Sequence, residues 1–134
     1  MSDWNTDIIT EFRANGGKVA QFGDAPLVIL HTIGAKSGEL REIPLVALVE
    51  GDELTVFGSK GGAPDNPDWV YNLRANPAIT VEYGTETFTA DVTELAVDDS
   101  QAKIQEQAQL MPQFGEYVKT AAPRIIPAFK LTRA

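Results

Sequence analysis

At 134 residues the chain is long enough for one domain with a single hydrophobic core, and its hydrophobic fraction of 43% is ordinary for a globular protein. The formal net charge of −8 argues against nucleic-acid binding, which needs a surplus of Lys and Arg. The absence of cysteine excludes disulfides and thiolate chemistry. No apolar run approaches the roughly 18 residues of a spanning helix, and the first residues lack the positive region and the apolar core expected of a signal peptide. These features predict a cytoplasmic protein without stable membrane insertion.

The N-terminal segment, residues 1–17, is predicted to be an amphipathic helix over 3–14 that ends at Gly16 and Gly17. Its apolar side chains at helical spacing are Trp4, Ile8, Ile9 and Phe12. Two interpretations stay open: the apolar face packs on the core, or the helix is a flap that covers a site or touches a membrane. Its acidic flank disfavours attraction to anionic lipid.

Residues 27–33 form a continuous β-branched and apolar run, which predicts a buried strand. Residues 34–38 follow as a glycine-bracketed turn, and a second apolar run over 43–50 predicts another strand. Glycine lets backbone N–H groups approach an anion, and Lys36 and Arg41 add positive charge. Because a strand follows the turn, this is a hairpin and not a P-loop, which requires a helix at that point.

The rest of the chain predicts further strands and short helices, with turns between them. Asn66 is predicted to cap the helix over 68–74, with Pro67 at its first position, and Pro127 within the last strand indicates an edge or a bulge. The predicted strands are 53–59, 78–83, 86–95 and 125–132, and the later helices are 98–110 and 113–120. About six mostly antiparallel strands predict a mainly β (α+β) fold, a closed or half-open barrel in one domain, 1–134.

Two motifs make the chain resemble a known family. They read T-x-G-x-K-S-G-x-x-R-x-x-P-L from Thr32 to Leu45, and S-K-G-G-A-P-x-x-P-x-W-x-x-N-L-x-A-N-P from Ser59 to Pro77. With this order and separation the chain resembles the deazaflavin-dependent nitroreductase family. That resemblance implies a split β-barrel fold and hydride transfer from reduced coenzyme F420 to quinones, activated enones or lactones, or nitro-aromatics.

The resemblance also implies the residues that bind the cofactor. The first loop would hold its phosphate and the start of its anionic tail, the Pro-Leu pair would line the deazaflavin ring, and the second loop would close on both. Trp69 and Asn72 would support the second loop. The predicted cofactor-binding residues are His31, Lys36, Ser37, Gly38, Arg41, Pro44, Leu45, Ser59, Lys60, Gly61, Gly62, Trp69 and Asn72.

His31 is the only histidine, and no partners are spaced to make a metal site with it, so no metal is predicted. Taken from the strand pattern alone, His31 is expected to be a hydrogen-bonded strand residue and not a catalyst.

The acceptor site is predicted at Val46, Met111, Phe114 and Tyr117. The nitroreductase after which the family is named resembles this chain here but carries more tyrosines, so this pocket is expected to be more apolar and poorer in proton donors. Ser59 and Tyr117 are candidate proton donors, but solvent could serve, and no residue is assigned as catalytic.

The loss of those tyrosines leaves open a non-catalytic deazaflavin-binding or carrier protein. A split barrel that binds flavin mononucleotide is the third interpretation. The partners expected are a small electron-poor acceptor and no nucleic acid, in a monomer or homodimer.

Overall fold

The computed structural model describes residues 3–134, with the side chains from Asn5 onward. The predicted contribution of Trp4 to the apolar face therefore lies outside the described residues, as do the first two residues of the segment 1–17. Helix α1 spans Asp3–Ala14, as predicted, and the chain then turns at Gly16 and Gly17, both of which have positive φ.

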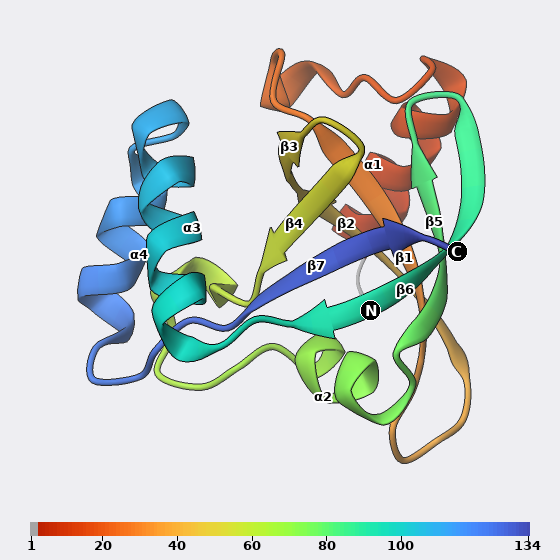
Figure 1. Cartoon of the computed structure of the whole chain (residues 1–134). Helices are drawn as coiled ribbons and strands as arrows, with labels where there is room; N and C mark the ends of the chain where they lie inside the picture. The colour runs from red at the N-terminus through yellow and green to blue at the C-terminus, as the bar shows by residue number, and fades with distance from the viewer. Residues whose placement is uncertain (1–2) are drawn as a thin grey trace.

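Seven strands form one antiparallel sheet in the order β2-β1-β5-β6-β7-β4-β3 (Figure 1). The predictions for 27–33 and 78–83 match the observed strands at both ends. The strands are β1 (Leu27–Ile33), β2 (Leu40–Val46), β3 (Leu48–Glu50), β4 (Glu53–Phe57), β5 (Ala78–Tyr83), β6 (Glu86–Glu94) and β7 (Ala128–Arg133).

The sheet curls because its two ends are joined through one residue. β2 and β3 lie at opposite ends of the strand order, yet only Ala47 separates them along the chain. The Ala47 N–H donates to the Pro26 carbonyl oxygen (2.9 Å), outside either ladder. The single strand predicted over 43–50 is therefore two strands that pair with different neighbours. The predicted split-barrel class, mainly β, is confirmed.

Both faces of β1 are buried, which explains its uninterrupted apolar sequence. Val28 and Leu30 pack inside the barrel in the largest core cluster. The alternate residues Leu27 and Ile29 pack on the other face with α1, whose buried side chains include Ile8, Ile9 and Phe12. The apolar face of α1 thus packs on the sheet, which is the first of the two interpretations of this helix.

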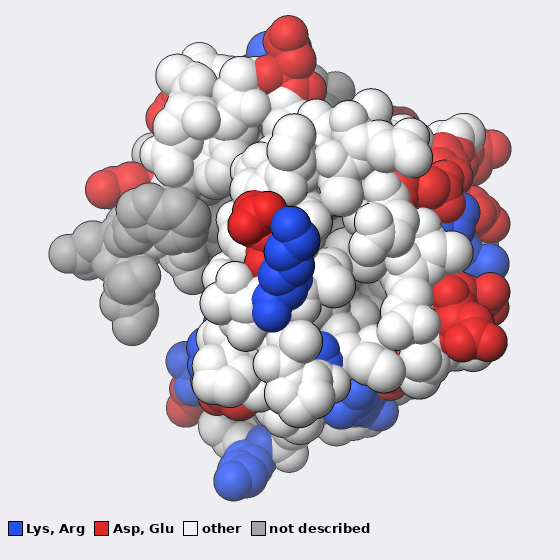
Figure 2. All heavy atoms as spheres, turned by 90° about the vertical axis from the view of Figure 1, so that its left-hand side faces the viewer, with Lys and Arg blue, Asp and Glu red and all other residues white. Residues whose placement is uncertain are grey.

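Short helices complete the fold around the barrel. Figure 1 shows α3 and α4 side by side beyond one end of the barrel and α2 across its lower side. Figure 2 looks onto the α3–α4 side, where uncharged residues predominate and acidic side chains lie mainly towards the edges. The helices are α2 (Asp68–Ala75), α3 (Val97–Leu110) and α4 (Gln113–Ala121), with 3-10 turns η1 (Ala20–Phe22) and η2 (Lys60–Gly62). Within residues 3–134, no helix is both long and apolar enough to span a bilayer.

Two local predictions are wrong. Pro67, with φ −68° and ψ 157°, is itself the N-cap of α2, because the Asn66 side-chain oxygen accepts a hydrogen bond from Arg124 (2.6 Å) instead of capping the helix. Pro127 is neither in an edge strand nor in a bulge. It precedes β7, which lies between β6 and β4, and its carbonyl oxygen accepts from the Gly58 N–H (2.9 Å).

Candidate functional site

A cavity of about 860 Å³ lies between the β1–β2 loop and α2. We call it the cation-rimmed cavity, because Lys36 and Arg41 are exposed at its edge. Arg41 is 3.5 Å from Glu39, whereas Lys36 has no carboxylate within ion-pair distance among the described side chains, residues 5–134. The lining residues are Gly34, Ala35, Lys36, Ser37, Arg41, Ile43, Asp68, Trp69, Tyr71 and Asn72.

The loop 34–39 owes its shape to contacts made behind it. Asn72 is buried in α2, and its side-chain oxygen accepts a hydrogen bond from the Ala35 N–H (2.9 Å). The Ser37 hydroxyl accepts from the Glu39 N–H (3.1 Å) and lies where a Cβ on Gly34 would sit, so a side chain at position 34 would displace this hydroxyl from its hydrogen bond. Asn72 thus supports this loop, and not the second loop as the resemblance implied.

A second cavity, of about 570 Å³, shares Ile43, Asp68 and Trp69 with the first. We call it the apolar cavity, since most of its lining is aliphatic or aromatic. The lining residues are Asn5, Phe22, Leu27, Ile43, Pro44, Leu45, Val46, Phe57, Ser59, Lys60, Gly61, Pro67, Asp68, Trp69, Phe114 and Tyr117.

Trp69 forms a wall common to both cavities. Its side chain is 6% exposed and meets the Phe129 ring edge-on, with ring centroids 5.7 Å apart. The first turn of α2 projects it from the bottom of the barrel, beside Asp68. A buried indole in this position gives a ligand that spans both cavities one rigid surface.

The loop 59–62 forms another wall of the apolar cavity. Lys60 pairs with Asp65 (3.1 Å) and holds the pKa of that carboxyl below its usual value, mainly through the hydrogen bond. Gly62 has φ 85°, and a Cβ there would lie 2.9 Å from the Thr120 Cβ and 3.2 Å from the Tyr117 Cα. Glycine is therefore required for the loop to pack against α4.

Helix α4 supplies the aromatic end of the apolar cavity. The rings of Phe114 and Tyr117 meet edge-on at 5.2 Å, and Phe57 packs on Phe114 at 5.9 Å. Val46 faces these rings from the end of β2. The predicted acceptor residues Val46, Phe114 and Tyr117 thus line one cavity together.

Four predicted site residues line neither cavity: His31, Gly38, Gly62 and Met111. Gly38 has φ 72° and closes the turn. Met111 packs beside the α3–α4 core, where its sulfur accepts a hydrogen bond from Gln107 (3.6 Å). The other predicted residues line one cavity or both.

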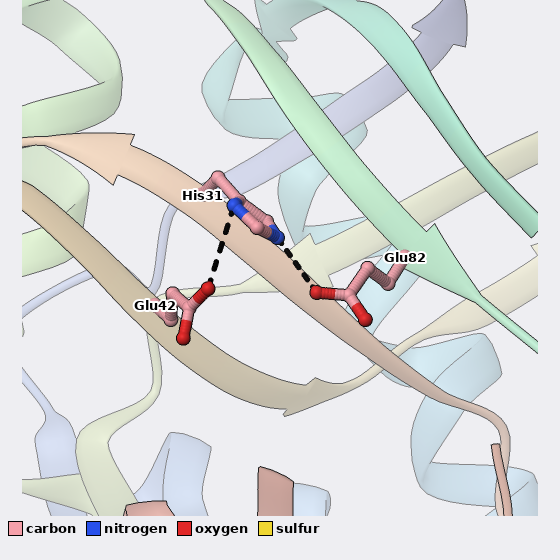
Figure 3. A group of neighbouring side chains, drawn as sticks. All are labelled: His31, Glu42 and Glu82. Carbon is pink, nitrogen blue, oxygen red and sulfur yellow. Dashed lines mark hydrogen bonds and ion pairs between the residues drawn. The ribbon is translucent and has the colours of Figure 1, made fainter. Parts of the chain in front are cut away.

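His31 lies on the α1 side of the sheet, between two carboxylates (Figure 3). Its Nε2 is 2.7 Å from Glu82, and its Nδ1 is 3.6 Å from Glu42. Arg13 of α1 donates to both carboxylates, at 2.6 Å to Glu82 and 2.9 Å to Glu42. We call these four residues the outer ion cluster.

One atom each of His31, Glu42 and Glu82 lies within 4.8 Å of the other two, so tertiary packing gives His31 the carboxylate neighbours that the sequence spacing did not indicate, although the contacts of the cluster are those of ion pairs. The two ring nitrogens of His31 face different carboxylates, and Arg13 already compensates their charge. The hydrogen bond from Arg13, helped by His31, lowers the pKa of Glu82 despite its burial. These contacts fasten α1 to β2 and β5.

The sequence analysis missed several residues at the site. Asn5 of α1, Phe22 of η1 and Leu27 of β1 line the apolar cavity, and Asp68 lines both cavities. Arg124, which follows α4, binds the back of the loop 58–66. No local pattern indicates any of these positions, because each is brought to the site by tertiary packing.

The comparisons with known proteins agree with this architecture. Residues 5–132 match the family model described as F420H(2)-dependent quinone reductase. The F420H(2)-dependent quinone reductase Rv1261c of Mycobacterium tuberculosis is 35% identical over 79 residues, which cover 58% of this chain and 53% of that protein. The match thus spans about half the length of this curated relative.

Solved structures give the same result. One described as an F420-H2 dependent reductase (FDR-A) is 32% identical, with a TM-score of 0.70, and the match covers 79% of this chain and 93% of that one. Another, described as a domain-swapped dimer, is 30% identical with a TM-score of 0.72, over 96% and 97% of the two chains. The resemblance read from the two loop motifs is confirmed: the chain belongs to the F420H(2)-dependent quinone reductase family.

Proposed function

We propose that this protein is an oxidoreductase that transfers a hydride from reduced coenzyme F420 to an electron-poor acceptor of the quinone class. The observation that carries the proposal is the pair of cavities that share Trp69, one edged by cations and the other apolar. Coenzyme F420 consists of a planar ring joined to a phosphate and a carboxylate tail, so it requires an apolar and a cationic environment along one groove. The residues that line the two cavities therefore fit this cofactor.

The cation-rimmed cavity supplies the anion-binding end. Lys36 and Arg41 offer charge-assisted hydrogen bonds to phosphate and carboxylate oxygens, which are the strong class of hydrogen bond. Asn72 keeps the loop in place by accepting from Ala35. Charge on this loop also concentrates an anion near an otherwise acidic protein.

The apolar cavity supplies the ring-binding end and the acceptor site. Pro44, Leu45 and Trp69 offer apolar surface for a ring, while Phe114 and Tyr117 face the space left for the acceptor. Reduced F420, when bound, supplies the hydride. The protein then contributes orientation of the two reactants and exclusion of water.

The reaction also requires a proton at a quinone oxygen. Conversion of a quinone to a hydroquinone takes two electrons and two protons, and a hydride carries both electrons with one of the protons. Ser59 and Tyr117 line the apolar cavity and carry hydroxyl groups that could deliver or relay the second proton. Solvent is the alternative source, and a Ser59→Ala, Tyr117→Phe double variant that keeps full turnover would favour it.

The test is to mix the purified protein with reduced F420 and menadione without oxygen, and to follow the return of oxidised F420 absorbance. We expect turnover above the protein-free control. Tight F420 binding without turnover would favour the carrier interpretation, and a yellow protein as purified would favour flavin mononucleotide. Parallel assays with an enone lactone and a nitro-aromatic rank the other acceptor classes. Size-exclusion chromatography distinguishes the predicted monomer from a homodimer.

A further inference from the structure

The loop 58–66 is held from behind by one guanidinium group. Arg124 donates from Nη1 to the Gly58 carbonyl oxygen (3.0 Å) and to the Asn66 side-chain oxygen (2.6 Å). Its Nη2 donates to the carbonyl oxygens of Ser59 (2.9 Å) and Ala63 (2.8 Å), and its Nε donates to Ala63 as well (3.1 Å). All five N–H groups of the side chain are therefore used on one loop.

None of these acceptors is a carboxylate, and Arg124 forms no ion pair with the described side chains, residues 5–134. The side chain thus acts through geometry, since only a planar fork with five donors can serve four oxygens at once. A lysine would keep the charge and offer three donors from a single atom.

This arrangement directs the opposite side of the loop towards the apolar cavity. In a trans peptide the N–H points away from the carbonyl, so the carbonyls of Gly58 and Ser59 that face Arg124 turn the N–H groups of Ser59 and Lys60 the other way. The backbone of Ser59 has the right-handed helical conformation (φ −75°, ψ −37°). Lys60 (φ 49°) and Gly61 (φ 62°, ψ 20°) have positive φ. This order of conformations brings successive N–H groups to one concave side.

These N–H groups are available to a ligand. Those of Ser59, Lys60 and Gly61 have no acceptor in the described backbone, residues 3–134, or among the described side chains, residues 5–134. The Ser59 side chain is 8% exposed, lines the apolar cavity, and its hydroxyl makes no hydrogen bond within that same range. Lys60, moreover, is the only described residue other than glycine with positive φ, a conformation that costs free energy unless its surroundings impose it.

We infer that the backbone N–H groups of residues 59–61, together with the Ser59 hydroxyl, form an oxyanion site for a conjugated carbonyl oxygen in the apolar cavity. Arg124 is the positioning residue that maintains this site. A carbonyl oxygen of the quinone acceptor gains negative charge when the hydride reaches its ring, and preorganised donors stabilise that charge. A carbonyl of the deazaflavin ring could accept the same hydrogen bonds, but it gains no charge when the hydride leaves, so the donors would then contribute to cofactor binding. The inference rests on the proposed function.

The variants that test it are Arg124→Lys and Ser59→Ala, with Arg133→Met as the matched control. Arg133 pairs with Glu86 (2.7 Å) and lies over the Phe88 ring, and it lines neither cavity. Each protein is measured for thermal unfolding, for oxidised F420 affinity by fluorescence titration, and for kcat and KM with menadione. Thermal unfolding identifies a variant that does not fold, and Ser59→Ala, which leaves the Arg124 contacts intact, then carries the test.

If the quinone oxygen occupies the site, kcat falls about tenfold or more in both variants while KM and F420 affinity stay near the control, because the lost interaction belongs to the transition state. If the deazaflavin carbonyl occupies it, the Kd for F420 rises about tenfold in both. Folded variants whose Kd, kcat and KM all stay within about twofold of Arg133→Met would overturn the inference. Wild-type protein that binds F420 without turnover refutes the proposed function alone, and the titration still decides the inference.

Discussion

The two loops at the site are supported in different ways. The loop 34–39 has, among the described side chains, one hydrogen bond from the rest of the fold, between Asn72 and the Ala35 N–H, and it exposes Lys36 to solvent. The loop 58–66 is bound through five hydrogen bonds by Arg124, and Gly62 packs directly on α4. The difference matches the ligand: a flexible anionic tail tolerates an adaptable loop with charge, whereas a rigid ring that must react requires donors at fixed positions.

The largest expected effect is at Trp69, which forms the wall common to both cavities. Trp69→Ala should lower the free energy of unfolding by about 3–5 kcal/mol, since a buried aromatic is replaced by a void. F420 affinity should also fall, because both cavities lose a side. Urea denaturation and fluorescence titration measure the two effects. Tyr71→Ala, on the same helix and 47% exposed, is the control and should change stability far less.

The next largest effect is expected from removing the cations at the edge of the cation-rimmed cavity. Lys36→Ala should weaken F420 binding by about 1.5–3 kcal/mol, the range for hydrogen bonds to charged groups, and added salt should narrow the difference from wild type. Arg41→Ala should have a smaller effect, since Arg41 already lies near Glu39. Lys119→Ala, an exposed cation paired with Glu116 outside both cavities, serves as control. Equal affinity of Lys36→Ala and wild type would show that the phosphate lies elsewhere.

A smaller effect is expected from removing the single support of that loop. Asn72→Leu leaves the Ala35 N–H without its acceptor and should weaken F420 binding by about 1 kcal/mol. Hydrogen exchange at Ala35 should accelerate, while exchange in the loop 58–66 stays as in wild type. If both loops loosened together, the contrast between them would be wrong.

No effect on F420 affinity is expected from the outer ion cluster, which instead affects stability. The folded-state pKa of Glu82 is lowered from 4.5, so its contribution is present above that value and is lost as the pH falls through the lower folded pKa. The free energy of unfolding of Glu82→Gln should therefore fall less than that of wild type as the pH is lowered below about 4.5, because glutamine does not titrate. Urea denaturation at several pH values measures this difference. A changed F420 affinity at pH 7 would bring this cluster into the site.

The local sequence pattern predicted most of the helices and strands, because each of them has a characteristic spacing of apolar residues or a turn at its end. The apolar run of β1, the alternation in β6 and the glycine-rich turns place these segments within a few residues of their observed ends. Asn66 shows where local rules fail: an asparagine before a proline indicates a cap, but its oxygen bonds to Arg124, 58 residues away. His31 is a second case, because its register opposite Glu42 and next to β5 places it with Arg13 and not with the loops.

The sequence by itself determined the family, the barrel class and the identity of both loops, because loop chemistry depends on glycines and cations at short spacing. Only the tertiary structure decided what supports each loop. Asn72 and Arg124 act on backbone groups 37 and 61–66 residues away, and such contacts leave no periodic mark in a sequence. For the same reason, no sequence pattern marks the backbone N–H groups of residues 59–61, which have no acceptor in the part of the chain that the structure describes.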